Sequence, residues 1–261
     1  MERYENLVFE TREGVALLTL NNPDQRNPLT EETKTEMIRA LDSIKEEGDI
    51  RSLLITGAGK AFCAGGDVKN IGRELSDDEI RQVMLKSQKL LKGILNLEKP
   101  VVCAVNGDAF GMGCNLALAS DFVIASERAR FCEVFVKLGL VPDFGALYIL
   151  PRLVGLSKSK ELAYLGTVLS AREAEEMGLV YKVVPHEELE REAMDLALRL
   201  ASMPTLAIGR AKRLLNRAFD MTLDQVLEEE IKAQTRLSRT EDHREGIGAL
   251  RDRRKPGFKG R

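Results

Sequence analysis

The stretch KPVVCAVNGDAFGMGCNLALASDFVIAS, residues 99–126, contains the pattern that decides the fold of this chain. After Pro100, the apolar run at 101–107 predicts a buried strand, and DFVIAS at 121–126 predicts a second one. Between the two runs, residues 112–120 predict a short helix. Because a helix that connects two strands packs back onto their sheet, this succession indicates an α/β fold with crossover connections.

The same alternation of strand and helix extends toward the N-terminus. GVALLTLN at 14–21 and IRSLLITG at 50–57 predict buried strands, since both are rich in aliphatic and β-branched residues and end at turn signals. Apolar residues at helical spacing predict a helix over 29–47, which the following glycine ends. SDDE at 76–79 has the spacing of a capping box and predicts the start of another long helix.

The second half of the chain has a different pattern. From about residue 156 the sequence predicts helices almost throughout, interrupted by the apolar run LVYKVV at 179–184. SARE at 170–173 again has capping-box spacing. The basic tail at 253–261 is predicted to lack regular structure. No linker rich in glycine, serine or proline separates the two halves, so we expect the helices to pack directly on the core.

Composition and charge exclude several classes of partner. Apolar residues make up 44% and charged residues 31% of the 261 residues, and the net charge is −2. This balance gives no global attraction to nucleic acid or to an anionic membrane. The segment MERYENLVFE is not a signal peptide, and no apolar run is long enough to span a membrane. We therefore expect no nucleic-acid partner, no membrane partner and a cytoplasmic location.

Histidine and cysteine usage argues against two further classes of site. The only histidines, His186 and His243, both lie in charged helical contexts, so neither a metal site nor a Ser-His-Asp triad is expected. The cysteines form no CxxC pair and are predicted to be reduced, packed thiols. They are Cys63, Cys103, Cys114 and Cys132.

A first glycine-rich loop, GAGKAFCAGGD at 57–67, directly follows a predicted strand. A phosphate-binding P-loop would need Ser or Thr where Ala61 stands, and a dinucleotide-binding loop would need glycine where Phe62 stands. What remains is the pair Gly65-Gly66, whose backbone N–H groups can approach a ligand closely. The alternative is a loop that needs glycine only for its backbone conformation.

A second glycine-rich loop, NGDAFGMGCN at 106–115, lies between a predicted strand and a predicted helix. Its N–H groups near the helix N-terminus favour negative charge. Two such loops, each giving one N–H, would form an oxyanion hole for a thioester carbonyl that becomes an enolate.

Five segments resemble the enoyl-CoA hydratase/isomerase (crotonase) superfamily in the same order and at similar spacing. They are AFCAGGDVK (61–69), the stretch at 99–126, KLGLVPDFG (137–145), LPRLVG (150–155) and LSAREAEEMGLVYKVV (169–184). The resemblance implies a spiral core of ββα units over residues 1–200 and a helical oligomerisation segment over 201–261. It also implies homotrimers, often paired into hexamers, and an acyl-CoA thioester substrate. CoA is then part of the substrate, and no separate cofactor or metal is expected.

The resemblance also implies roles for individual residues. It places the two oxyanion donors on the backbone N–H groups of Gly66 and Met112, where Met112 replaces the more usual glycine. The CoA-binding residues that it implies are Ala64, Gly66, Asp67 and Val68 around adenine and pantetheine, Arg26 and Lys69 at the phosphates, and Phe258 and Lys259 at the adenine end, in the same or a neighbouring subunit. For each basic residue the alternative is a solvated surface charge.

Two departures from the family pattern concern the acid/base groups. Typical hydratases of the family carry glutamates at the positions of Asn115 and Phe135. Hydration needs a group that activates water and a proton donor for carbon, so the usual apparatus is missing. Glu133 lies two residues before Phe135 and could face the same side if the segment is extended, but we expect it to be a surface or ion-paired carboxylate.

Asp143 is the predicted acid/base. It matches the position where ring-opening phenylacetyl-CoA isomerases of the superfamily keep their single acid/base, and Asn115 also looks like that group. One carboxylate is enough for a 1,3-proton shift. If Val141, Phe144 and Phe135 desolvate Asp143, they raise its pKa and strengthen it as a base. The sequence therefore predicts an isomerase; the alternatives are a hydratase with non-standard acid/base residues, a catalytically silent acyl-CoA binder, and a structural role for Asp143 in the turn.

Two other readings are disfavoured. Asp143 would match the nucleophile of superfamily 4-chlorobenzoyl-CoA dehalogenases, but these also use a histidine upstream of the VNG loop, and no histidine precedes His186. One superfamily branch binds AU-rich RNA through a basic helix, and Arg210, Arg213 and Arg217 do fall on one helical face. The net charge and the lack of interleaved aromatic residues favour a solvated or subunit-contact face instead.

Overall fold

The computed structural model describes residues 4–67 and 74–261, and in them two sheets form the frame. The larger sheet has six strands in the order β1-β2-β3-β5-β7-β10, and the smaller has four in the order β4-β6-β8-β9. Strand pairs β1–β2 and β8–β9 are antiparallel and the other pairs are parallel. The strands are β1 Leu7–Arg12, β2 Val15–Leu20, β3 Ser52–Gly57, β4 Ala61–Cys63, β5 Val101–Val105, β6 Asp108–Phe110, β7 Phe122–Ser126, β8 Arg130–Cys132, β9 Val168–Ser170 and β10 Lys182–Val184.

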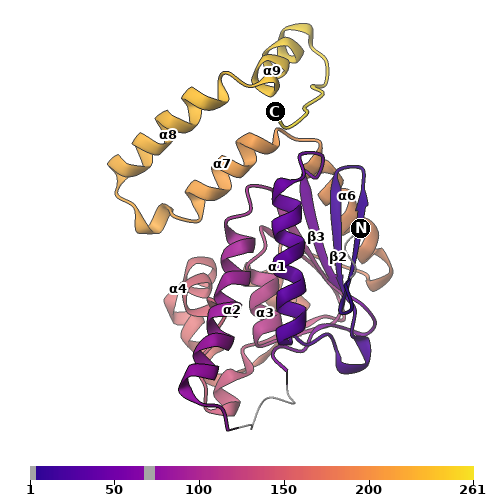
Figure 1. Cartoon of the computed structure of the whole chain (residues 1–261), viewed down its shortest axis with the longest axis vertical. Helices are drawn as coiled ribbons and strands as arrows, with labels where there is room; N and C mark the ends of the chain where they lie inside the picture. Colours follow the sequence, from indigo (N-terminus) through magenta and orange to yellow (C-terminus); the bar gives the residue numbers. More distant parts are fainter. Residues whose placement is uncertain (1–3, 68–73) are drawn as a thin grey trace.

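Helices cover both faces of the larger sheet (Figure 1). The α-helices are α1 Glu31–Glu46, α2 Asp77–Leu95, α3 Met112–Leu118, α4 Ala146–Leu165, α5 Ala171–Glu176, α6 Leu189–Ala201, α7 Thr205–Leu215, α8 Leu223–Leu237 and α9 Glu241–Asp252. Short 3-10 helices lie at η1 Pro23–Gln25, η2 Val134–Leu138, η3 His186–Glu188 and η4 Ala218–Asp220. None of the helices in the described ranges has the length and apolar character of a membrane span.

Successive residues of the central strands point into two different cores. On β3, Leu53 and Ile55 pack in the larger core together with α1 and α2, whereas Leu54 packs in a second core against α6. The parallel register pairs Leu54 with Val102, which lies in the same second core. Because both faces are covered, these strands read as continuous apolar runs, and this explains why the sequence pattern predicted them.

The capped helix starts are confirmed by their hydrogen bonds. The capping boxes at Ser76–Glu79 and Ser170–Glu173 both form and begin α2 and α5. The N-cap Thr30 accepts a hydrogen bond from Thr33 N and begins α1. These caps satisfy N–H groups that the first helical turn leaves without partners.

Some elements differ from the sequence prediction. β1 and the four strands of the smaller sheet were not predicted; three-residue strands are too short to show a period. Helix α4 begins at Ala146 rather than near residue 156, and Gly155, at φ +72°, kinks it. Pro151, which has no N–H to donate, lies in the second turn of α4.

The last three helices lie together at one end of the molecule, beyond α6 (Figure 1). Buried Lys212 of α7 anchors them to the core through an ion pair with Asp121, with 2.8 Å between Nζ and Oδ2. The tail lacks regular structure, as expected, yet it is held in place: Asp242 accepts hydrogen bonds from the N–H groups of Lys259 and Gly260 at 2.6 and 2.9 Å. The oligomerisation role of residues 201–261 stays a prediction.

Candidate active site

The two glycine-rich segments meet backbone to backbone, because β4 and β6, which lie within them, are paired in parallel. A Cβ atom on Gly65, at φ +102°, would lie 2.8 Å from the carbonyl oxygen of Phe110 and 3.6 Å from Met112 N. A Cβ on Gly113 would lie 2.3 Å from the carbonyl oxygen of Cys63. Glycine is therefore required at both positions for this close approach, and at Gly65 also for the backbone conformation.

The meeting of the loops brings the two predicted donor N–H groups to one edge of the smaller sheet. Met112 is the first residue of α3, so its N–H has no partner inside the helix. Gly66 follows Gly65, whose carbonyl accepts a hydrogen bond from Leu29 N at 2.8 Å, and the space beside the Gly66 Cα is open. Within residues 4–67 and 74–261, neither of these two N–H groups donates a hydrogen bond.

The loop that carries Gly66 is supported from η1. Ala64 N donates to the carbonyl oxygen of Arg26 at 2.9 Å, so exposed Arg26 lies beside the loop as expected. Buried Asn27 donates from Nδ2 to the carbonyl oxygens of Ala58 and Ala61, both at 2.9 Å, and fixes the preceding turn. Sequence reasoning did not identify this support.

The other predicted CoA-binding residues do not all lie beside the loop that carries Gly66. Asp67 follows Gly66 directly and is half-buried, while Val68 and Lys69 lie outside the described residues. Phe258 is bound through its carbonyl oxygen to Arg51 Nη1 at 2.7 Å, beyond the far end of α1. Since α1 begins beside the loops and its 16 residues extend about 24 Å, Phe258 and Lys259 are remote from Gly66 of the same chain. Contact with the CoA of a neighbouring subunit stays a prediction.

Asp143 is held in a tight turn against α3. Phe144 and Gly145 have φ of +48° and +77°, and α4 starts immediately after them. The carbonyl oxygen of Asp143 accepts hydrogen bonds at 3.0 Å from Ala146 N and from the side-chain amide of Asn115 on α3. A bulky residue at positive φ is uncommon, and such strain is often found at functional sites.

Asp143 is half-buried, and its Oδ1 is buried without a hydrogen-bond partner among the described residues. Burial raises its pKa to about 6, while positively charged Lys34 opposes the rise. Lys34 of α1 is itself buried, where it contacts Ser87 Oγ at 3.2 Å and pairs with Glu31. The expected desolvation of Asp143 is thus confirmed, although Val141 takes no part in it, because its side chain is 72% exposed.

The surface position expected for Glu133 is wrong. Its residue is 3% exposed, its Oε2 lies 3.5 Å from Asn115 Nδ2, and its Oε1 has no partner among the described residues. Burial is the main cause that raises its pKa to about 7, and the negative charge of Asp143 adds to the rise. Glu133 stands at the N-cap position of the 3-10 helix η2, directly after β8, and the turn of the chain there buries its side chain.

Neither position that carries a hydratase glutamate places a carboxylate here. Asn115 is buried and its amide bonds to the Asp143 carbonyl. Phe135 is also buried, and its ring packs over Gly111 of the second loop, 3.6 Å from where a Cβ would stand. Asn115 instead joins two other residues that carry carboxyl groups, Asp143 and Glu133. Sequence reasoning placed Glu133 at the surface because no motif marks it.

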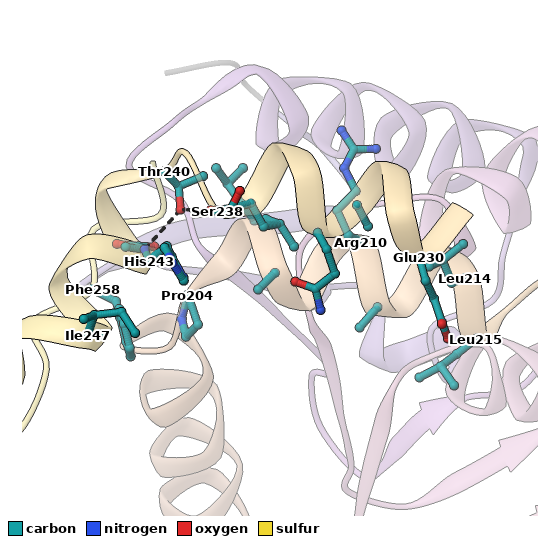
Figure 2. Close-up of a pocket in the computed structure, with 18 residues that line it drawn as sticks. Pro204, Arg210, Leu214, Leu215, Glu230, Ser238, Thr240, His243, Ile247 and Phe258 are labelled. Carbon is teal, nitrogen blue, oxygen red and sulfur yellow. Dashed lines mark hydrogen bonds between the residues drawn. The ribbon is translucent and has the colours of Figure 1, made fainter. Parts of the chain in front are cut away.

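A separate apolar groove of about 690 Å³ lies between α7, α8 and α9 (Figure 2). Its lining residues, among them Leu214, Ile247 and Phe258, all fall between positions 204 and 258, so it is distinct from the glycine loops. On the same helix α7, Arg210 and Arg213 lie 3.0 and 3.4 Å from Glu98. Two arginines of the basic face are thus paired with Glu98, a partly exposed residue between α2 and β5.

The family model for enoyl-CoA hydratase/isomerase matches residues 10–261. The chain belongs to the enoyl-CoA hydratase/isomerase family. It is 39% identical over 260 residues to the 1,2-epoxyphenylacetyl-CoA isomerase of Escherichia coli K12, covering 98% of this chain and 99% of that protein. It is 38% identical over 256 residues to the crotonyl-CoA hydratase of Syntrophomonas wolfei, covering 98% of both proteins.

Solved structures support the same membership of the enoyl-CoA hydratase/isomerase family. The crystal structure of an enoyl-CoA hydratase from Bacillus anthracis superposes with a TM-score of 0.93 at 35% identity, covering 98% of this chain and all of that chain. The crotonase-type α/β fold that the resemblance implied is therefore confirmed. Isomerases and hydratases both occur among the relatives, so family membership leaves the reaction to be argued from the residues.

Proposed function

We propose that this enoyl-CoA hydratase/isomerase family member isomerises an unsaturated or ring-epoxide acyl-CoA by proton transfer through Asp143. The observation that carries the proposal is the hydrogen bond from Asn115 to the Asp143 carbonyl, because Asn115 lies on the short helix that begins with Met112. This bond couples the position of the base to that of a candidate oxyanion donor.

In the proposed reaction on an enoyl substrate, the thioester oxygen accepts hydrogen bonds from Gly66 N–H and Met112 N–H. Ionised Asp143 takes a proton from a carbon of the acyl chain: the C–H bond breaks, an O–H bond forms on the carboxyl, and the electron pair delocalises to the thioester oxygen as an enolate. Protonated Asp143 then returns the proton two carbons away. The product has the composition of the substrate, and no water is consumed.

Substrate binding is proposed to follow the family pattern. Arg26 would contact CoA phosphates, and the backbone from Ala64 to Asp67 would line the adenine and pantetheine. Exposed Arg26 beside Ala64 supports this placement. The predicted roles of Val68 and Lys69 remain part of the proposal, and CoA enters as part of the substrate.

A hydratase is the second candidate, and one observation favours it. Glu133 supplies a second buried carboxyl beside Asn115, although it is not at either position of the hydratase glutamates. The isomerase is preferred because neither position of the hydratase glutamates holds a carboxylate, and because Glu133 is buried whereas Asp143 is half-buried.

A panel of 2-enoyl-, 3-enoyl- and ring-epoxide CoA thioesters tests the reaction type, with products identified by mass and NMR. We expect isomerisation of at least one 3-enoyl or epoxide substrate to be much faster than hydration of crotonyl-CoA. Hydration of crotonyl-CoA without isomerisation of any member would establish the hydratase. Binding without turnover of any member would indicate a silent acyl-CoA binder.

We also propose that α7, α8 and α9 carry the subunit contacts of a homotrimer or of a hexamer built from two trimers. Large apolar side chains on these helices are exposed in the single chain, including Leu215 at 71%, Leu223 at 72% and Leu250 at 78%. Exposed apolar patches of this kind mark interaction surfaces. Light scattering after size-exclusion chromatography tests the proposal; a monomer at micromolar concentration would contradict it.

A further inference from the structure

Three buried acceptor oxygens lie around the side chain of Asn115. They are Asn115 Oδ1, Glu133 Oε1 and Asp143 Oδ1, and none has a hydrogen-bond donor among the described residues. The side-chain amide of Asn115 does not donate to these three oxygens. Its Nδ2 donates to the Asp143 carbonyl at 3.0 Å and toward Glu133 Oε2 at 3.5 Å. A buried acceptor without a donor is costly. We therefore expect one carboxyl group of this cluster to be protonated, so that it can act as a donor.

Of the two carboxyl groups in the cluster, Glu133 is the better place for that proton. Its residue is 3% exposed and it forms no ion pair within the described part of the chain, whereas Asp143 is partly exposed and feels the positive charge of Lys34. A buried carboxyl without a cation favours the neutral form. A protonated Glu133 is a hydrogen-bond donor as well as an acceptor, which the cluster needs.

We propose that Glu133 is a positioning residue, a neutral carboxylic acid that holds Asn115 and keeps Asp143 able to ionise. The proposal rests on the proposed function, in which Asp143 is the base. Glu133 acts through Asn115, because Glu133 is 3% exposed and its Oε2 lies 3.5 Å from Asn115 Nδ2, whereas Asp143 is half-buried. When Glu133 loses its proton, a second negative charge stands beside Asp143 and the developing enolate, and proton abstraction slows.

The protonation order of the two carboxyls supports this assignment. The pair titrates with raised pKa values, near 6 for Asp143 and near 7 for Glu133, and the charge of Asp143 is one cause of the rise at Glu133. The cation Lys34 beside Asp143 and the deeper burial of Glu133 both favour ionisation of Asp143 before Glu133. One group then serves as a base while its neighbour remains neutral.

The other titratable groups that face the pair do not produce this pH response. Cys114 on α3 and Cys132 on β8 are thiols whose pKa values burial raises, so they remain neutral in this range. Lys34 on α1 faces Asp143 as a cation. The response is therefore assigned to the two carboxyls.

The first test is the pH dependence of kcat/KM for the substrate that the panel identifies. In the wild type, kcat/KM is expected to rise with pH as Asp143 ionises and to fall at higher pH as Glu133 ionises, which gives a bell-shaped profile. Glu133→Gln, which is neutral at every pH, should lose the falling limb. The matched control Glu127→Gln, at an exposed position in the turn before β8, should keep the bell-shaped pH profile of kcat/KM. A falling limb that persists in Glu133→Gln overturns the proposal.

The second test needs no turnover, so it separates this inference from the proposed function. Carboxyl ¹³C NMR of labelled, substrate-free protein identifies Glu133 by the resonance that Glu133→Gln lacks. We expect Glu133 to ionise near neutral pH, and to ionise at lower pH in Asp143→Asn. An ordinary glutamate titration, or one that Asp143→Asn leaves unchanged, overturns the proposal even if Asp143 is the base. Conversely, full activity of Asp143→Asn refutes the proposed function while leaving the NMR coupling intact.

Discussion

Asn115 donates a hydrogen bond at 3.0 Å from its side-chain amide to the backbone carbonyl of Asp143. The bond joins α3, which begins with Met112, to the turn that precedes α4. It therefore fixes the distance between a candidate oxyanion donor and the candidate base. Because the bond uses the backbone of Asp143, the carboxyl group of that residue remains free for proton transfer.

The Gly66 N–H can be tested by a matched pair of variants. Gly66→Pro removes the N–H and should lower kcat by about 100- to 1000-fold, as loss of one oxyanion donor does. Gly66→Ala keeps the N–H, and its Cβ would meet no protein atom within 4 Å, so the loop should keep its conformation and kcat should fall far less than in Gly66→Pro. Steady-state kinetics and CoA affinity measure both. Equal losses of turnover and CoA affinity in Gly66→Pro would mean that the loop only holds CoA.

The neighbouring glycine should behave in the opposite way. Gly65→Ala adds a Cβ at φ +102° that would lie 2.8 Å from the Phe110 carbonyl oxygen, so the two loops must separate. We expect it to lose activity and to lower the thermal unfolding midpoint, in contrast to Gly66→Ala. The finding that the two alanine variants cannot be distinguished would contradict the backbone contact.

Lys34 should set the acidic limb of the pH profile. Its positive charge lowers the pKa of Asp143, which burial has raised. Removing that charge in Lys34→Met lets the pKa of Asp143 rise further, and the base is then ionised only at higher pH. The rising limb of kcat/KM should move upward in pH. A limb that stays in place or moves downward would show that Lys34 does not act on the base.

The raised pKa of Glu133 also predicts how stability depends on pH. A carboxyl whose pKa is about 7 when folded and near 4.5 when unfolded stabilises the fold fully below pH 4.5, and this contribution is lost as pH rises through 7. Glu133→Gln should therefore give no gain at pH 4 and a gain of up to about 3 kcal/mol at pH 8. Urea unfolding at the two pH values checks this. A gain of equal size at both would assign the effect to packing.

Much of the fold and part of the site could be predicted from the sequence. The central strands are buried on both faces and are continuous apolar runs, and the capping boxes at Ser76 and Ser170 mark helix starts with a specific hydrogen-bond chemistry. The glycine loops and Asp143 have positions that the family motifs share. Local patterns of this kind persist in the folded chain because tertiary contacts agree with them.

The remainder depends on contacts between distant parts of the chain. The three-residue strands of the smaller sheet have no period of their own. Glu133 was misplaced because its direction is set by the turn into η2, and Lys34 was missed because its burial between α1 and α2 has no local signal. A charged residue is usually exposed, and the burial of Glu133 and Lys34 becomes visible only in the assembled core.

The most direct measurement of the central claim is the isomerisation rate of Asp143→Asn at saturating substrate, beside its acyl-CoA affinity. Asn is nearly isosteric, and the backbone carbonyl that Asn115 binds is unchanged, so the fold and the affinity should be retained. Asn cannot accept the proton, so kcat should fall by at least about 100- to 10,000-fold. Asp143→Asn that retains most of its activity would contradict the account, because the proton would then move through another group.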